Sequence, residues 1–260
     1  LSIVNAPPQN MIRHGSVWDM LNRVPISPPV PTGSTRLDQI MNGGLYSSVA
    51  YEVNGVEMTG KTTWCLERCA EVVQQELCVI FLTCNNTPVR EIVGPDIPIL
   101  EGLSENIAED ESSIIIEHIF SPENLLAILR NIVHINTEFS EKDTSKRFFV
   151  VIDAITPLIM ASESDNFSAQ LRDIIFQIKA HGNWLLAISN GERVEMDYDC
   201  QNLLDGICDA GLTFTWHDAQ YIEVNRGGRK NGPSVRLTRA RQGLGIVQRG
   251  DVIPLEWKKM

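Results

Sequence analysis

Long hydrophobic runs are missing from this sequence of 260 residues. No stretch approaches the roughly 18 uninterrupted apolar residues that mark a membrane-spanning helix. The first apolar segment is short and is broken by Asn5, Pro7 and Pro8. The sequence therefore favours neither a membrane span nor a signal peptide, and we expect a soluble protein that has no membrane partner.

Paired cysteines and metal-type spacings are also missing. No C-x-x-C pair occurs, and most of the six cysteines lie in apolar stretches where a reduced thiol fills the core. The five histidines show no metal-ligand spacing. This pattern argues against a zinc site and against a disulfide framework. The six cysteines are Cys65, Cys69, Cys78, Cys84, Cys200 and Cys208.

Positive charge is scarce, since 22 Lys and Arg stand against 33 Asp and Glu and the net charge is −11. Such a charge usually argues against a nucleic-acid binder. The distribution is uneven, however, because residues 226–260 carry a net charge of +7 while the residues before them carry −18. This basic tail is either a set of solvated strand faces or a patch that faces phosphates or a partner.

A phosphate-binding loop is the most specific motif that the chain does contain. Residues 54–62 read N-G-V-E-M-T-G-K-T and fill every fixed position of the pattern G-x-x-x-x-G-K-[ST]. Glycines let backbone amides approach phosphate oxygens, while the lysine reaches the β- and γ-phosphates and the threonine hydroxyl binds Mg²⁺. We therefore predict a site for ATP and Mg²⁺. The predicted nucleotide-binding residues are Gly55, Val56, Glu57, Met58, Thr59, Gly60, Lys61, Thr62 and Thr63.

The surroundings of this loop favour a functional site over a chance match in a glycine-containing turn. Residues 49–53 read as a short strand and residues 62–76 as a helix with one apolar face. Further along, the apolar strand 148–152 ends in Asp153. Many buried strands end in aspartate at a turn, but beside a phosphate loop such a carboxylate holds the Mg²⁺ shell. We predict that Thr62 and Asp153 together hold the metal.

Alternating apolar segments predict an α/β fold, with a mostly parallel twisted sheet flanked by helices and a C-terminal antiparallel extension. A helix is expected to begin at Ser121-Pro122-Glu123, and another to cover residues 168–181 and end at Gly182. Residues 136–147 are polar and charged and are expected to form a surface loop. Further strands are expected at 77–83, 113–120 and 184–189, with a hairpin formed by 219–224 and 234–241.

The N-terminal residues 1–31 are expected to stand apart from a core that spans residues 32–260. They contain a short amphipathic segment around Trp18 to Leu21 and a stiff Pro-rich linker at residues 24–33. This segment either docks on a neighbouring subunit or packs against the sheet of its own chain.

The opening of the core resembles a known family. Residues 32–38 (T-G-S-T-R-L-D) and 42–45 (N-G-G-L), followed by the phosphate loop, look like the start of the RecA-type recombinase core. Residues 16–21 (S-V-W-D-M-L) are similar to the short helix that precedes this core in eukaryotic paralogues of the strand-exchange recombinase. The strands that end at Asp153 and Asn190 match in order and spacing, so the resemblance covers roughly residues 16–250.

The resemblance implies a RecA-like ATPase core and a nuclear role in homologous recombination and DNA double-strand break repair. It implies a paralogue that supports or remodels the recombinase filament together with a second paralogue, and that meets single-stranded DNA mainly through that complex. It also makes Asn190 a candidate γ-phosphate sensor and Arg90 a candidate adenine contact. Arg36 and Asp38 belong to the entry motif, and for them we expect a capping or turn role.

Two departures from the family bear on hydrolysis. The strand after the loop helix ends L-T-C-N-N at residues 82–86, without the family's water-orienting glutamate, and no carboxylate follows before Glu91. The next motif, T-N-Q in the family, reads Ser189-Asn190-Gly191 and so lacks the glutamine. A third departure concerns DNA, because the segment from Gly191 to Asp209 is acidic and would repel a phosphate backbone.

Three functions remain open from the sequence. The first is a nucleotide-binding recombination paralogue whose partner supplies the missing residues, so that ATP controls assembly more than turnover. The second is an active DNA-stimulated ATPase in which Glu91 or another acid replaces the glutamate. The third is a KaiC-like kinase or regulatory ATPase outside recombination. Weak or absent intrinsic hydrolysis is expected for the first.

Overall fold

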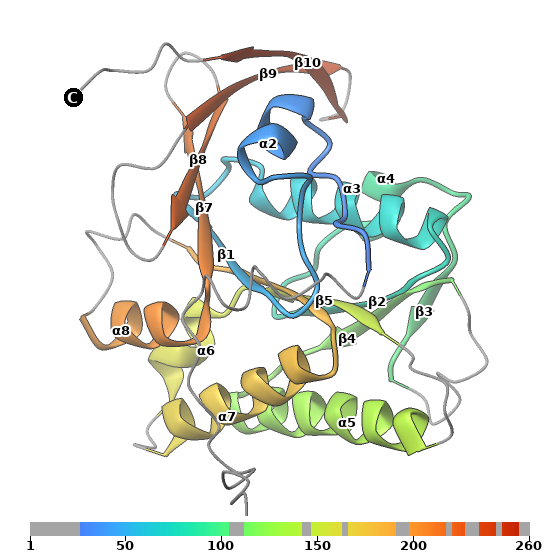
Figure 1. Ribbon diagram of the computed structural model, residues 1–260, viewed down its shortest axis with the longest axis vertical. Helices are drawn as coiled ribbons and strands as arrows, with labels where there is room; N and C mark the ends of the chain where they lie inside the picture. Colours follow the sequence, from blue (N-terminus) through green and yellow to red (C-terminus); the bar gives the residue numbers. More distant parts are fainter. Residues whose placement is uncertain are drawn as a thin grey trace, which may run out of the picture.

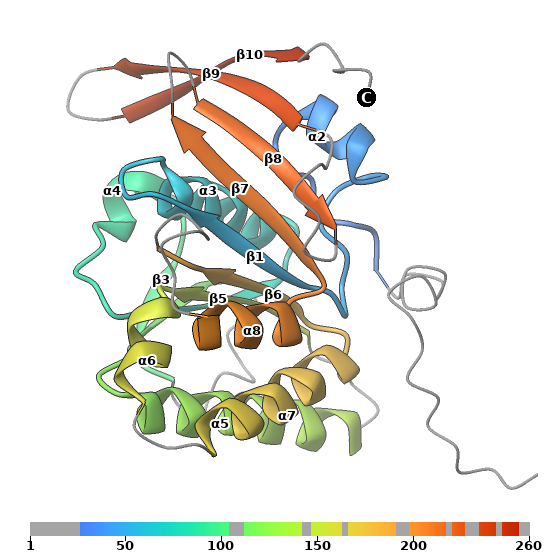
Figure 2. The same cartoon turned by 90° about the vertical axis from the view of Figure 1, so that its left-hand side faces the viewer.

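The computed structural model describes residues 27–254 apart from 104–111, 142–146, 163–165, 191–197, 217–219, 227–233 and 243–245. Its frame is one sheet, drawn in Figures 1 and 2. Seven strands pair in parallel: β1 (Ala50–Gly55), β2 (Cys78–Thr83), β3 (Ile99–Glu101), β4 (Ile114–His118), β5 (Phe148–Asp153), β6 (Trp184–Ile188) and β7 (Ala210–Trp216). Three more extend it in antiparallel fashion: β8 (Gln220–Arg226), β9 (Ser234–Gln242) and β10 (Ile246–Pro254).

The strand order is β10-β9-β8-β7-β1-β6-β5-β2-β4-β3. The predicted parallel sheet with an antiparallel extension is thereby confirmed, including the pairing of β8 with β9 that the hairpin prediction required. The glycine-rich turn of that hairpin lies outside the described residues. Strand β1 stands between β6 and β7, so the phosphate loop leaves the middle of the sheet.

Helices cover both faces of the sheet, which is why its inner strands are apolar throughout. All six residues of β2 and of β5 are buried. One face carries α2 (Thr35–Ile40), α3 (Lys61–Gln74) and α4 (Val89–Val93), and the other carries α5 (Pro122–Glu141), α6 (Thr156–Ala161), α7 (Phe167–Ala180) and α8 (Tyr198–Ile207). Among these described helices, none is both long enough and apolar enough to cross a membrane.

Most expected helix ends are confirmed. The Ser121 hydroxyl accepts a hydrogen bond from the Asn124 amide at the start of α5, at 3.1 Å. His181 is the C-terminal cap residue of α7, and Gly182 follows it with a φ of 81°. The core-filling role of the cysteines is confirmed for Cys65, Cys69, Cys78 and Cys200, which are buried as reduced thiols. The other two, Cys84 and Cys208, are half-buried and also reduced.

The predicted surface loop over residues 136–147 is wrong in its first half, because α5 continues to Glu141. The reason is Asn136, which is only 2% exposed. Its side-chain oxygen accepts a hydrogen bond from Nδ2 of Asn183 at 2.7 Å. A residue that reads as a loop former in the sequence is thus an interior partner, and the helix persists past it.

The acidic loop predicted from Gly191 to Asp209 needs a similar correction. Its second half forms α8, whose Leu203 and Leu204 are buried in the core. Asp209 binds Lys179 and the backbone amide of Ala50. At least one of the acids counted there as repelling DNA is therefore an internal partner. The first half, residues 191–197, lies outside the described residues.

The Pro-rich linker is corrected for residues 30–33, which belong to the folded body. Val30 pairs with Leu45 in an antiparallel bridge. The carbonyl of Pro31 accepts a hydrogen bond from Arg68, and that of Thr32 accepts one from the Trp64 indole at 3.0 Å. The segment around Trp18 to Leu21 lies outside the described residues.

The residues of the entry motif, 32–38, form hydrogen bonds with one another. Asp38 Oδ1 accepts hydrogen bonds from both the amide and the hydroxyl of Thr32, each at 2.7 Å. Ser34 caps α2 by accepting from the Leu37 amide at 3.2 Å. Arg36 donates a hydrogen bond to the side chain of Gln39 on the surface. The turn role predicted for Asp38 is confirmed.

Candidate nucleotide-binding site

The phosphate loop joins the end of β1 to the start of α3, the strand-loop-helix arrangement that the motif requires. Gly55 has a φ of 141°, and a Cβ there would lie 2.2 Å from the Phe214 carbonyl oxygen of β7. Gly60 is the N-cap of α3 in the left-handed region, and no side chain caps this helix. First-turn amides have no acceptor within their own helix, so this N-terminus offers donors and a positive dipole end to an anion.

Lys61 lies inside the loop and is 5% exposed. Its ammonium donates hydrogen bonds to the carbonyl oxygens of Gly55 at 2.7 Å and Val56 at 2.8 Å. Burial lowers the pKa of Lys61, and the negative charges of Asp153 and Glu57 oppose that shift. The sequence has therefore placed a buried cation at the position where phosphate charge is expected.

Thr62 and Asp153 meet although 91 residues separate them, with the threonine hydroxyl donating to Asp153 Oδ2 at 3.1 Å. Asp153 is 2% exposed. Burial raises its pKa, and the hydrogen bond from Thr62 and the charge of Lys61 oppose the shift. A hydroxyl and a carboxylate beside an uncapped helix N-terminus fit Mg²⁺ with nucleotide phosphates, because Mg²⁺ takes one or two protein oxygens and completes its shell with phosphate and water.

The remaining predicted loop residues differ in exposure. Thr59 is buried, and its hydroxyl donates to the Val56 carbonyl at 2.9 Å. Glu57 and Met58 face solvent, and Met58 is 80% exposed with a φ of 62°. Thr63 is half-buried in the first turn of α3. The structure thus brings residues 55–63 and Asp153 together, as the sequence predicted.

Asn190 follows β6, the strand that lies between β1 and β5. The register sets Ile188 beside both Val53 of β1 and Asp153 of β5. The amide of Asn190 donates to the hydroxyl of Thr156 at 3.0 Å. The candidate sensor is therefore attached to the strand end between the phosphate loop and Asp153, the predicted metal ligand, while Gly191 lies outside the described residues.

Two buried polar residues near this strand end were not identified from the sequence. Glu52 of β1 and Ser189 are both fully buried, and the Ser189 hydroxyl donates to Glu52 Oε1 at 2.8 Å. A signal existed, since Glu52 is a charged residue inside an apolar strand that leads into the phosphate loop. Its partner lies 137 residues away and cannot be identified from spacing.

The end of β2 holds a thiol and two amides where the family has a glutamate. Cys84 Sγ lies 3.6 Å from the Ala154 carbonyl oxygen, next to Asp153. Burial raises the pKa of Cys84; the hydrogen bond to the Ala154 carbonyl opposes this shift, and the nearby Asp153 charge adds to it. Asn85 and Asn86 are exposed. The described residues that directly follow β2, at positions 84–86, therefore provide no carboxylate that could orient water.

Arg90 and Glu91 lie on α4, which packs against α3. The Arg90 guanidinium donates to the carbonyl oxygens of Pro95 at 3.2 Å and Ile97 at 2.6 Å. It therefore braces the connection between α4 and β3. Glu91 is exposed. The adenine contact of Arg90 stays a prediction.

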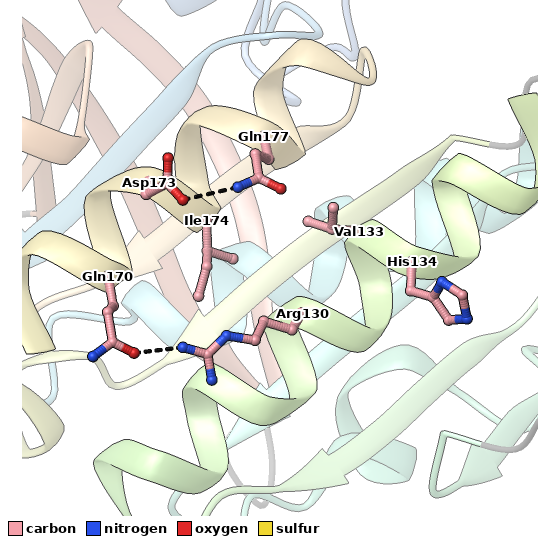
Figure 3. A pocket seen from close by; sticks show the side chains of 7 residues that line it. All are labelled: Arg130, Val133, His134, Gln170, Asp173, Ile174 and Gln177. Atoms are coloured by element: carbon pink, nitrogen blue, oxygen red, sulfur yellow. Dashed lines mark hydrogen bonds between the residues drawn. The ribbon is translucent and has the colours of Figure 1, made fainter.

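A separate hollow lies between α5 and α7, and its lining side chains are drawn in Figure 3. Arg130 donates to the Gln170 side chain, and Gln177 donates to Asp173 at 2.9 Å. These polar groups bind one another and do not converge on a common point. The phosphate loop therefore remains the candidate functional site.

Comparison with known proteins agrees with this geometry. The family described as the KaiC ATPase matches residues 30–214, which is more than half of the chain. The matched region contains the phosphate loop, Asp153 and Asn190. Among curated proteins, none matches the chain. The match supports the RecA-like ATPase part of the resemblance, whereas its recombination part stays a prediction.

Proposed function

We propose that the chain, which belongs to the KaiC-type ATPase family of RecA-like phosphate-loop proteins, is a recombinase paralogue in which ATP controls assembly more than turnover. The supporting observation is an imbalance in the site. Lys61, Thr62 and Asp153 provide the ammonium, hydroxyl and carboxylate groups suited to bind phosphate and Mg²⁺. Cys84, however, follows β2 at the position where hydrolysis needs a group that orients water.

The chain's own residues would act in binding as follows. The N-terminus of α3 receives the phosphates, and the ammonium of Lys61 exchanges the carbonyls of Gly55 and Val56 for phosphate oxygens. Thr62 and Asp153 would hold Mg²⁺, which supplies charge neutralisation when bound. Binding to one assembly state in preference to another then shifts the population toward it.

The resemblance of residues 32–38 to the recombinase opening supports a place in homologous recombination. The proposed partner is a second paralogue or related subunit that supplies the missing hydrolytic residues. The pair would support or remodel the recombinase filament on single-stranded DNA in the nucleus during DNA double-strand break repair. The net charge of −11 is consistent with DNA contact mainly through the complex.

The family match favours a second candidate, a KaiC-like regulatory ATPase outside recombination. Both candidates need nucleotide binding, so repair in cells distinguishes them. Cells that lack this protein should be sensitive to double-strand breaks. Wild-type protein should restore repair, and Lys61→Ala should not. Normal repair in cells lacking the protein would favour the KaiC-like candidate.

Assays on the purified chain test the binding function directly. Wild-type protein should bind Mg-ATP and turn it over slowly. Lys61→Ala should weaken binding by about two orders of magnitude, because a charge-assisted contact with phosphate is lost. Arg36→Ala, which removes a half-buried cation of the entry motif, is the control and should bind normally.

Robust hydrolysis by the single chain, abolished by Lys61→Ala, would contradict control by binding alone and would favour the active ATPase that uses Glu91 or another acid.

Co-purification from cells tests the proposed partner. A stoichiometric recombinase or paralogue is expected, and recovery of an isolated monomer would count against the recombination role.

A further inference from the structure

We propose that Glu52, Ser189 and Thr156 are positioning residues that hold Asn190 at the γ-phosphate and let the site distinguish ATP from ADP. The proposal rests on the nucleotide-binding function above and adds to it a means of detecting the third phosphate. It starts from the buried pair of Glu52 and Ser189, which the binding mechanism does not use.

A carboxyl group at the location of Glu52 needs an explanation. The residue is fully buried as the third residue of β1, directly before Val53, and inner strands of parallel sheets are usually apolar. Burial of a polar group is costly unless hydrogen bonds compensate. Room is made by Ala187, its small neighbour in β6, and the Ser189 hydroxyl supplies a hydrogen bond.

The alternation of side chains puts this pair on the face of the sheet opposite α3. Ala50 of β1 and Ala187 of β6 belong to the core on the face that carries α5 to α8, and Glu52 and Ser189 share that parity. Ile188 belongs to the opposite core, on the face of α3, and Asn190 shares the parity of Ile188. The pair therefore anchors Ser189 on one face while its neighbour Asn190 is directed toward the other.

Three hydrogen bonds hold Ser189 and the backbone amide of Asn190 in place. The amide of Ser189 donates to the Val53 carbonyl at 3.0 Å, and its hydroxyl donates to Glu52. The amide of Asn190 donates to Thr156, three residues after Asp153. The strand end is thus bound both to the strand that forms the phosphate loop and to the segment that follows the metal ligand. Loss of either side-chain contact should loosen Asn190 without altering the loop.

The consequence is selective for ATP. Contacts of the loop with the α- and β-phosphates are available to both nucleotides, whereas a contact of Asn190 with the γ-phosphate is available to ATP alone. A loosened Asn190 should therefore weaken ATP binding and leave ADP binding unchanged. A purely structural role would lower thermal stability and leave the ratio of the two dissociation constants unaltered.

The test measures dissociation constants for Mg-ATP and Mg-ADP on the full chain, together with thermal unfolding. Ser189→Ala and Thr156→Val should each reduce the preference for ATP by about fivefold to tenfold, the size expected for one well-formed hydrogen bond. Glu52→Gln and Thr156→Ser keep the acceptor oxygen and should retain the preference. Ser113→Ala removes a buried hydroxyl that has no partner and serves as the matched control.

An unchanged preference in folded Ser189→Ala and Thr156→Val proteins would overturn the proposal. If Ser189→Ala fails to fold, the comparison of Thr156→Val with Thr156→Ser decides alone, because that pair differs in the acceptor. Failure of the wild-type chain to bind either nucleotide would instead contradict the proposed function, so the two failures are distinguishable.

Discussion

At the scale of single residues, the predicted metal-binding role of Asp153 comes with a cost in stability. Burial raises its pKa above the ordinary value in the nucleotide-free protein. A group shifted in this direction adds stability below its unfolded-state pKa and loses that contribution as the pH rises through the folded-state pKa. At neutral pH the buried carboxyl group of Asp153 is therefore unfavourable for folding, and Mg²⁺ would compensate for it.

We expect Asp153→Asn to raise the unfolding temperature of the nucleotide-free protein at pH 7 and to abolish the stabilisation by Mg-ATP. The gain should shrink as the pH falls toward about 3.9, the ordinary aspartate value, because Asp153 is then protonated. Thermal unfolding across pH measures both effects. Asp173→Asn, at an exposed site on α7, should show neither. A lower unfolding temperature for Asp153→Asn at pH 7 would contradict the argument.

The sequence identified candidate site residues that belong to a recognisable local pattern. It did not identify residues that become neighbours only in the folded structure. Lys61 and Thr62 belong to one contiguous motif, and Asp153 ends an apolar strand. Glu52 and Ser189 become neighbours only through the pairing of β1 with β6. No local pattern encodes that contact, because it depends on strand order.

At the scale of elements, Asn183 joins three of them. Its side-chain oxygen accepts from the Phe148 amide at the start of β5 at 2.8 Å. Its amide group donates to Asn136 of α5 and to the Ile178 carbonyl of α7. This arrangement also explains why the predicted loop at residues 136–147 is wrong, since an asparagine reads as a loop residue until its buried partner is known.

We expect Asn183→Ala to lower the free energy of unfolding by about 3 kcal/mol, because several buried polar groups lose their partner at once. Denaturant unfolding provides the measurement. Asn202→Ala, at an exposed position in α8, is the matched control and should change little. A loss below that of the control would mean that water replaces Asn183 at no cost.

The ion pair of Lys179 and Asp209 connects α7 with the start of β7, and Asp209 Oδ2 also accepts from the Ala50 amide at 2.9 Å. Both side chains are largely buried, at 9% and 14% exposure. Lys179→Met should cost about 3 kcal/mol in unfolding free energy, because it leaves a buried carboxylate without its cation. The double variant Lys179→Met, Asp209→Asn should recover most of that loss. Equal stability of the single and double variants would contradict this.

Two short elements were not predicted from the sequence, and the reason is physical. Strand β3 has three residues and α4 has five, so neither repeats its apolar period often enough to be recognised. Long apolar segments such as β5 and α7 were predicted nearly to their ends. The length of an element therefore decides whether it can be recognised from a single sequence, because a longer element buries more side chains on one face.

At the scale of the whole molecule, the sheet type was predictable and the strand order was not. Strand β1 pairs with β6 and β7 although more than 130 residues separate them. Each inner strand sends alternate side chains to the two cores, as Phe149 and Val151 do on the face of α3 and Phe148 and Val150 on the other. The two cores therefore share one sheet and should unfold together.

This shared sheet predicts how nucleotide binding is transmitted. Mg-ATP at one hundred times its dissociation constant should stabilise the native state by about 2.7 kcal/mol and raise the unfolding temperature by about 5–10 °C. Because the cores are coupled, hydrogen exchange should slow in α5 and α7 on the far face as well as in α3. Lys61→Ala should abolish both effects. Protection confined to α3 would contradict a single cooperative unit, since α5 and α7 would then open independently of the phosphate loop.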